Sequence, residues 1–207
     1  MAYPVRVRID YREPRSRLTT ALRFPLAVPH LVAAAVVGIA AAIAVPVAWC
    51  AILVTGRCPR PISRFLQGAI RYVARVGCYW MLVTDPFPPF RLRPADHDDP
   101  VEVAVDEPER HARLSVLARL PLAVPAWLVA YFLGLFALMM AFAAWWVILV
   151  TGRLPRSMFE VMELPHRYQA RVAAYTCLLV DEYPWFREEG GAAPSGWGAQ
   201  PGIQRIS

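Results

Sequence analysis

Residues 23–57 read RFPLAVPHLVAAAVVGIAAAIAVPVAWCAILVTGR, and the 33 residues between Arg23 and Arg57 carry no formal charge. A helix needs about 20 apolar residues to cross a bilayer, so this run is long enough to do so. It ends in Thr-Gly-Arg, where Gly56 suits the left-handed conformation that stops many helices. The stretch therefore predicts a membrane-spanning helix over about residues 29–54.

The same pattern occurs a second time in the chain. Residues 5–90 align without a gap onto residues 101–186 at a constant offset of 96, with identical residues at 35 of 86 positions. The second copy also has 33 uncharged residues, between Arg119 and Arg153, and predicts a membrane helix over about residues 125–150. The chain is therefore a tandem duplication, with a first repeat at 1–90, a linker at 91–100 and a second repeat at 101–186.

Each predicted membrane helix is followed by a helical segment of a different character, at residues 61–83 and 157–180. In the first of these, polar residues recur every three or four positions and share one face, with large apolar residues opposite. That stripe comprises Arg60, Arg64, Gln67, Arg71 and Arg75. Basic amphipathic helices of this kind are typical of segments that lie in the headgroup plane of a membrane. We favour this in-plane position and keep a return span as the alternative.

A short strand is expected at the start of each copy. Val5, Val7 and Ile9 alternate with charged residues, and residues 101–105 alternate in the same way, which is the period of a half-buried strand. The charges are mainly basic in the first strand and acidic in the second, so we hypothesise that the strands pair. Paired strands require an even number of membrane crossings between them, whereas flat amphipathic helices would leave the strands on opposite faces. Both flanks of each span are basic, so the positive-inside rule does not decide between these arrangements.

Composition favours a membrane protein. Hydrophobic residues make up 57% of the chain and charged residues 18%, against about 25% charged in soluble domains. The predicted fold class is a mainly α membrane protein with two tandem repeats, each made of a short β-strand, a transmembrane helix and an amphipathic basic helix. Residues 187–207 are rich in glycine and proline and are predicted to be a disordered tail.

The phrase R-Y-x-A-R-V-x-x-Y occurs in both second helices and is the most specific chemical signal in the chain. Its polar residues are Arg71, Arg75 and Tyr79 in the first copy, and Arg167, Arg171 and Tyr175 in the second. Two arginines four residues apart share a helix face, and arginine binds phosphate and carboxylate through paired hydrogen bonds. We therefore predict that these residues bind an anionic lipid phosphate or a partner's carboxylate. The alternative is that the arginines pair with Asp85 and Asp181 while the tyrosines anchor at the membrane interface.

Charge is distributed unevenly between the halves, at +7 for residues 1–100 and −1 for residues 101–207. One hypothesis is that the two copies dock with Arg64 near Glu160 or Glu163. The alternative is an ion pair within one helix, between Glu163 and Arg167 at i, i+4.

No repeated constellation points to catalysis. At each position occupied by one of the four cysteines or four histidines the other copy has a different residue, and the cysteines lack the C-x-x-C spacing of metal sites. We therefore expect no catalytic residue, no metal ligand and no cofactor, and interpret the isolated histidines as surface or packing residues. The positive charge flanks lipid-length spans without a recognised binding motif, which argues against nucleic acid as a partner.

The order R-x-P-L-A-x-P, then W-x-x-I-L-x-T-G-R-x-P, then R-Y-x-x-R-V-x-x-Y, then D-x-x-P-x-F is present in both copies. It resembles an uncharacterised domain-of-unknown-function family of small, mainly actinobacterial membrane proteins that are often built from two such units. The second copy departs from the pattern by ending in Pro-Trp-Phe in place of Pro-Pro-Phe. The resemblance implies a multi-pass protein of the bacterial cytoplasmic membrane, and it brings no activity, cofactor or catalytic residue.

The function favoured by the sequence is a non-enzymatic accessory or scaffold subunit that contacts anionic membrane lipid or a membrane protein complex. The alternative is a small lipid or solute transporter, which would require polar groups inside the spans, and these offer almost none beyond His30. An interfacial enzyme is a third possibility, and it would need a recurring acid, base or nucleophile.

Overall fold

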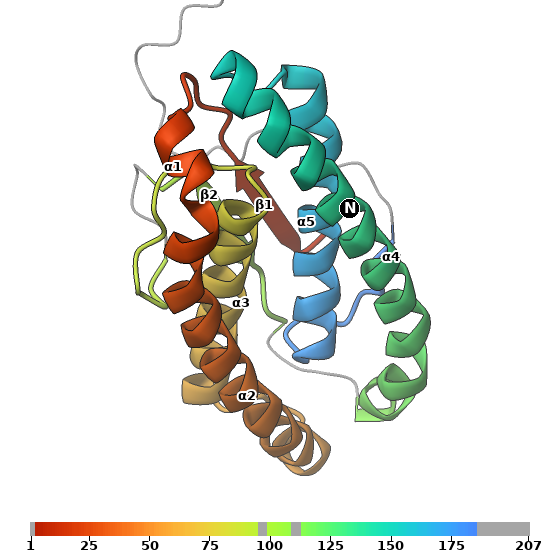
Figure 1. Ribbon diagram of the computed structural model, residues 1–207. Coiled ribbons are helices and arrows are strands. Elements are labelled where there is room, and N and C mark those ends of the chain that lie inside the picture. The colour runs from red at the N-terminus through yellow and green to blue at the C-terminus, as the bar shows by residue number, and fades with distance from the viewer. Residues whose placement is uncertain (1–2, 95–98, 109–112, 186–207) are drawn as a thin grey trace, which may run out of the picture.

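Each copy of the repeat folds as a short strand, a long helix and a shorter helix that runs back along the long one (Figure 1). The computed structural model describes residues 3–94, 99–108 and 113–185. The elements in chain order are β1 (Val5–Ile9), α1 (Arg17–Ala21), α2 (Arg23–Thr55), α3 (Arg60–Trp80), β2 (Val101–Val105), α4 (Arg113–Thr151) and α5 (Arg156–Thr176). The mainly helical fold of two tandem copies is therefore confirmed. The predicted tail at 187–207 and linker residues 95–98 lie outside the described residues.

The long helices α2 and α4 correspond to the two uncharged runs, and both begin earlier than the sequence predicts. Gly56 and Gly152 end them as expected, each with a φ of 73°, a conformation that glycine adopts without strain. Each glycine donates its backbone N–H to the carbonyl four residues earlier at 2.7 Å. By length and composition, α2 and the Pro121–Thr151 part of α4 are suited to crossing a membrane.

The strands of the two copies form one antiparallel sheet, as hypothesised. The register pairs Val7 with Val103, and the valines at positions 5, 7, 101 and 103 point inward and are buried. On the outer face Arg6 binds Asp106 at 3.0 Å, and Arg8 lies 3.6 Å from Glu102, so the opposite charges of the two strands meet. Pairing of the strands is therefore confirmed, whereas the number of membrane crossings between them stays a prediction.

The two copies are related by an approximate two-fold axis. Val7 and Val103 are equivalent residues at the offset of 96, and they face each other in the sheet. Equivalent tryptophans also make equivalent hydrogen bonds between copies: the Trp49 indole donates to the carbonyl of Val116 at 3.4 Å, and Trp145 donates to that of Thr20 at 3.1 Å. Because an antiparallel pair has its two-fold axis perpendicular to the sheet, α2 and α4 run in opposite directions, as Figure 1 shows.

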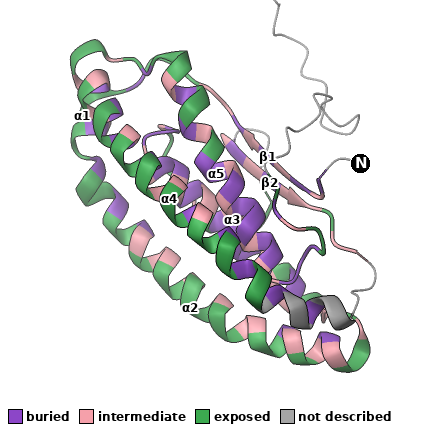
Figure 2. Cartoon of the chain, turned by 90° about the vertical axis from the view of Figure 1, so that its right-hand side faces the viewer, coloured by how far each residue is buried: buried purple, intermediate pink, exposed green. Residues whose placement is uncertain are grey.

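The molecule has three layers, with α2 and α4 on one side, α3 and α5 in the centre and the sheet on the other side (Figure 2). The in-plane position of the second helices stays a prediction, and the structure shows how these helices pack within the protein. Each packs antiparallel on the long helix of its own copy, and its polar stripe is partly covered by other parts of the chain. Arg71, for example, donates from Nε to the carbonyl of Val103 in β2 at 3.0 Å.

Candidate anion-binding site

The corner between α2 and α3 places three arginines close together. The Thr55 hydroxyl accepts the backbone N–H of Arg57 at 3.2 Å, which holds the turn that follows the glycine stop. Pro59 then precedes the first residue of α3, Arg60, and no side-chain hydrogen bond caps this helix start. Arg64 follows one turn later on the same face, so the three side chains flank one end of α3.

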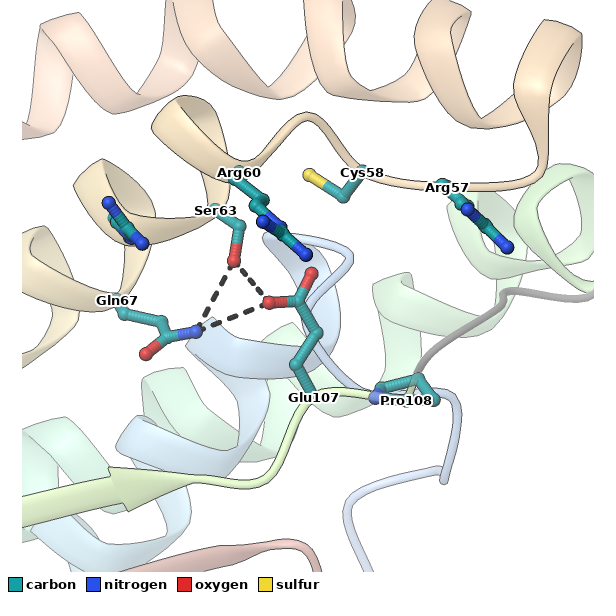
Figure 3. Close-up of a pocket in the computed structure, with 8 residues that line it drawn as sticks. Arg57, Cys58, Arg60, Ser63, Gln67, Glu107 and Pro108 are labelled. Atoms are coloured by element: carbon teal, nitrogen blue, oxygen red, sulfur yellow. Dashed lines mark hydrogen bonds between the residues drawn. The ribbon is translucent and has the colours of Figure 1, made fainter.

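These arginines border a polar hollow of about 660 Å³. It is lined by Arg57, Cys58, Arg60, Ser63, Arg64, Gln67, Glu107 and Pro108 (Figure 3). Glu107 reaches in from the segment after β2 and accepts the hydroxyl hydrogen of Ser63. Gln67 donates from Nε2 to the same carboxylate and to the Ser63 oxygen, both at 3.3 Å. The carboxylate is therefore held at the base of the hollow.

Positive charge exceeds negative charge at this site. Arg57, Arg60 and Arg64 are exposed, and Glu107 is the one carboxylate among the lining residues. The start of α3 has no side-chain cap, and the positive end of its helix dipole favours anions. Burial and the nearby Glu107 charge raise the pKa of the Cys58 thiol to about 11, so we expect the Cys58 side chain that lines the hollow to be neutral at pH 7. The arrangement suits a phosphate or carboxylate group.

The equivalent corner of the second copy is closed. Tyr11 occupies the position that corresponds to Glu107, and Phe159 the position that corresponds to Ser63. Their rings pack edge to face with centroids 5.1 Å apart, and the Tyr11 hydroxyl donates to the carbonyl of Leu154 at 2.6 Å. Glu160 replaces Arg64 and pairs with Arg156. The polar hollow is therefore a feature of the first copy's corner, and we call the second corner closed because the contact of Tyr11 with Phe159 occupies the equivalent place.

The arginines of the predicted R-Y-x-A-R-V-x-x-Y site in the first copy bind the protein itself. Arg75 is 3% exposed and donates to the carbonyls of Arg91 at 3.1 Å and Arg93 at 2.9 Å. Burial and the adjacent charge of Arg75 lower the pKa of Arg71. Tyr79 is not beside them: it lies under the Arg23 guanidinium, 4.3 Å from its ring centroid.

The second copy repeats this separation. Arg167 pairs with Glu163 at 3.3 Å, and Arg171 donates to the carbonyl of Trp185 at 3.4 Å while lying over the Tyr3 ring. Tyr175 is buried and faces Arg119 instead. The three residues predicted as one site are thus distributed between two environments in each copy.

The alternative pairing of these arginines with Asp85 and Asp181 also differs from the structure. Asp85 pairs with Arg23, and Asp181 with the equivalent Arg119. These two pairs join the N-terminal part of each long helix to the segment that follows the second helix. The R-x-P-L-A-x-P and D-x-x-P-x-F phrases therefore meet, and their shared role is structural.

The structure also differs from the hypothesis that the two copies dock through Arg64, and it has the alternative ion pair within one helix. Glu163 pairs with Arg167 on its own helix, as the i, i+4 spacing predicts. Glu160 pairs with Arg156, while Arg64 borders the hollow at the end of the first copy. Of the four histidines, His30 and His166 are buried packing residues, and His97 and His111 lie outside the described residues.

A second cavity, of about 510 Å³, lies between the two copies. Its walls come from the middle of α2 and from α4, where Ala41 and Trp127 face it, and its floor from α3 and α5. Most lining residues are small and apolar, and His166 and Gln169 are among the few polar ones. We call this cavity the central groove.

Sequence reasoning missed Glu107 and Ser63, which set the polarity of the hollow. Neither residue belongs to a recurring phrase, because the other copy has Tyr11 and Phe159 at these positions. The sequence nevertheless contained a clue to this site. A position with a polar residue in one copy and an aromatic residue in the other is one where the two copies have diverged. Positions of that kind are where a function confined to one copy is to be sought.

No curated protein and no solved structure matches the chain. A family model does match, and it does so twice, over residues 17–91 and 113–188, which together cover most of the chain and begin after each strand. The chain therefore belongs to the DUF4389 family of domains of unknown function and contains two tandem copies of that domain.

Proposed function

We propose that this protein is a non-enzymatic accessory or scaffold protein of the cell membrane, and that the hollow at the α2–α3 corner binds the phosphate of an anionic lipid. The observation that carries the proposal is the grouping of Arg57, Arg60 and Arg64 around a polar hollow next to the end of an apolar helix. Arginine forms paired hydrogen bonds with phosphate, and a headgroup would lie at this level if the helix contacts hydrocarbon.

The membrane location is supported by the apolar side chains that α2 and α4 leave uncovered. Only 6% of the most apolar window of α2 is buried, and 22% of that of α4. Exposed side chains such as Val36, Ile39 and Phe136 would be unusual on a soluble protein in such number, because contiguous apolar surface of this kind marks an interaction site. A lipid surface matches it in chemistry.

The test compares lipid binding after substitution of three arginines at the hollow with binding after substitution of two arginines at the closed corner of the second copy. The triple variant Arg57→Gln, Arg60→Gln, Arg64→Gln and the control Arg153→Gln, Arg156→Gln are purified in a neutral mild detergent. Binding of a short-chain phosphatidylglycerol is measured by native mass spectrometry, with phosphatidylcholine as the uncharged reference. Each arginine near an anionic headgroup contributes about 1 kcal/mol, so the triple variant should bind about 100-fold more weakly. The control should change less than about threefold, because its corner is closed.

Two results would contradict the proposal. Undiminished phosphatidylglycerol binding by the triple variant would show that the hollow is not the lipid site. Release of the native chain from membranes by alkaline carbonate would contradict the proposal that the protein is embedded in the membrane. The accessory role has its own measurement, which is retention of a stoichiometric membrane-protein partner during purification in gentle detergent.

The central groove favours a second candidate function, that of a small lipid transporter or carrier. The groove is open, apolar and of a size suited to part of an acyl chain, with His166 and Gln169 as polar groups at its floor. Filling it with the substitution Ala41→Phe would abolish lipid transfer between vesicles if the protein carries lipid. Headgroup binding at the hollow would remain unchanged.

A further inference from the structure

We propose that the chain lies in a single leaflet, with α2 and α4 flat against the hydrocarbon and the β-sheet facing water, and does not cross the bilayer. This rests on the membrane location proposed above and specifies which face of the molecule meets the lipid. It differs from the multi-pass arrangement that the sequence predicts. Three observations carry it: the position of the charged sheet, the length of the apolar helices and the location of the basic ends.

The two-fold axis can lie in the membrane plane or along the membrane normal, and these are the two orientations of the protein that we compare. The axis passes through the sheet and between α2 and α4, since it relates Val7 to Val103 and Trp49 to Trp145. If the axis lay in the membrane plane, the long helices would cross the bilayer in opposite directions and the sheet would face sideways. If the axis lies along the membrane normal, α2 and α4 are parallel to the surface and the sheet is the part farthest from the lipid (Figure 2).

The charges of the sheet distinguish these placements. Arg71, in the middle of α3, donates to the carbonyl of Val103 in the middle of β2, so the sheet lies beside the middle of the helices. Its outer face carries two ion pairs, Arg6 with Asp106 and Arg8 with Glu102, whose side chains are 33–63% exposed. Crossing helices would place these four charges at half depth in the hydrocarbon, where charged groups facing lipid are costly and rare. Flat helices leave them in water.

The length of the apolar helices points the same way. α2 has 33 residues, which corresponds to about 50 Å of helix, against a hydrocarbon core of about 30 Å. Exposed apolar side chains extend along it from Phe24 to Val54. To bury that length by crossing, the helix would have to tilt by about 50°, beyond the usual range of about 0–40°. A helix lying flat has no such limit.

The basic ends of the helices supply the third observation. Arg57 follows the end of α2 and Arg153 the end of α4, and these ends lie at opposite ends of the molecule (Figure 1). Crossing helices would put the two groups on opposite sides of the membrane, although basic flanks are usually confined to the cytoplasmic side. In the flat placement both groups face the same leaflet. All basic flanks then lie on one side of the membrane, which agrees with the positive-inside rule for a protein in the cytoplasmic leaflet.

The experiment labels equivalent positions of the two copies. Arg57→Cys and Arg153→Cys are made separately in a chain without its own cysteines, and Ile39→Cys, on the exposed face of α2, is the depth control. The native cysteines are replaced, three of them by their counterparts in the other copy, as Cys50→Ala, Cys58→Leu, Cys78→Ala and Cys177→Met. A membrane-impermeant maleimide is applied to right-side-out and to inverted vesicles, and then after detergent.

The single-leaflet placement predicts that Arg57→Cys and Arg153→Cys are both labelled in the same type of vesicle and both protected in the other. Ile39→Cys should be labelled only after detergent. Labelling of the two end positions in opposite vesicle types would overturn the inference and leave the membrane location intact. Labelling of Ile39→Cys without detergent would instead overturn the membrane location, so the two failures are distinguishable.

Discussion

Replacing Arg23 by alanine should destabilise the protein more than replacing an exposed arginine by alanine. Arg23 is 2% exposed, pairs with Asp85 and donates from NH1 to the carbonyls of Tyr79 and Thr84, both at 2.7 Å. These contacts join the start of α2 to the end of α3. In the alanine variant the Asp85 carboxylate and the two carbonyl groups lose this hydrogen-bond donor. A buried polar group without a partner lowers the free energy of unfolding.

The size of the loss follows from the burial of the two partners. Breaking a fully buried ion pair by removing one member costs about 3–5 kcal/mol. Because the Asp85 side chain is 22% exposed, water stabilises the remaining charge in part, and the lower end, about 3 kcal/mol, is expected. For a chain of this size that corresponds to a Tm lower by about 6–12 °C.

The duplication supplies a matched variant, Arg119→Ala. Its partner Asp181 is 32% exposed, so the equivalent pair should lose less stability than the Arg23 pair. Thermal unfolding of all variants is followed by tryptophan fluorescence in one mild detergent. In the double variant Arg23→Ala, Asp85→Asn the loss should be smaller than the sum of the single losses, with a coupling of about 0.5–3 kcal/mol.

A loss of less than about 1 kcal/mol for Arg23→Ala, the value of a surface ion pair, would contradict the structural role of the Arg23–Asp85 pair. A larger loss of stability for Arg119→Ala than for Arg23→Ala would contradict it as well. Additive losses in the double variant would mean that Asp85 and Arg23 act independently, and the two family phrases would then have no shared structural role.

Three further outcomes follow from the geometry. In a chain without its native cysteines, Val7→Cys with Val103→Cys should form a disulfide on mild oxidation, detected by mass, because this non-hydrogen-bonded pair has Cα atoms about 4.5 Å apart. Gly68→Ala should cost about 1–3 kcal/mol in thermal unfolding, since the added Cβ would lie 2.7 Å from the backbone oxygen of Leu92. With the other cysteines replaced, alkylation of Cys58 should be slow at neutral pH and rise about tenfold per pH unit until near its pKa of about 11, and a plateau near pH 8 would contradict this.

Features set by local pattern were predictable from the sequence. The uncharged runs gave the long helices, Gly56 and Gly152 marked their ends, and the alternation of Val5 and Val7 with arginines gave the first strand. Pairing of the strands was also predictable, because one strand is mainly basic and the other acidic, and these opposite charges meet across the sheet at Arg8 and Glu102.

The position of the candidate site was not predictable from helical periodicity. Periodicity correctly grouped Arg71 and Arg75 on one face of α3, but it treats a helix as isolated. The chain returns 16 residues later and covers Arg75 with the carbonyl of Arg91. Likewise the hollow depends on Ser63 meeting Glu107, a contact between residues 44 positions apart that no local spacing encodes.

The contrast between the two corners suggests why the duplication was retained. A symmetric pair of identical copies would have either two open hollows or two closed corners. Here Tyr11 and Phe159 close one corner with an aromatic contact, while Glu107 and Ser63 keep the other polar, although the Thr-Gly-Arg turn and the following proline are the same in both. Arg57 and Arg60 also have arginine counterparts in the second copy, so the differing residues decide which corner stays open. Giving the first corner the residues of the second should therefore close the site: Glu107→Tyr with Ser63→Phe should abolish phosphatidylglycerol binding while the Tm stays close to that of the native chain. A variant that still binds the lipid would show that the arginines act without the hollow.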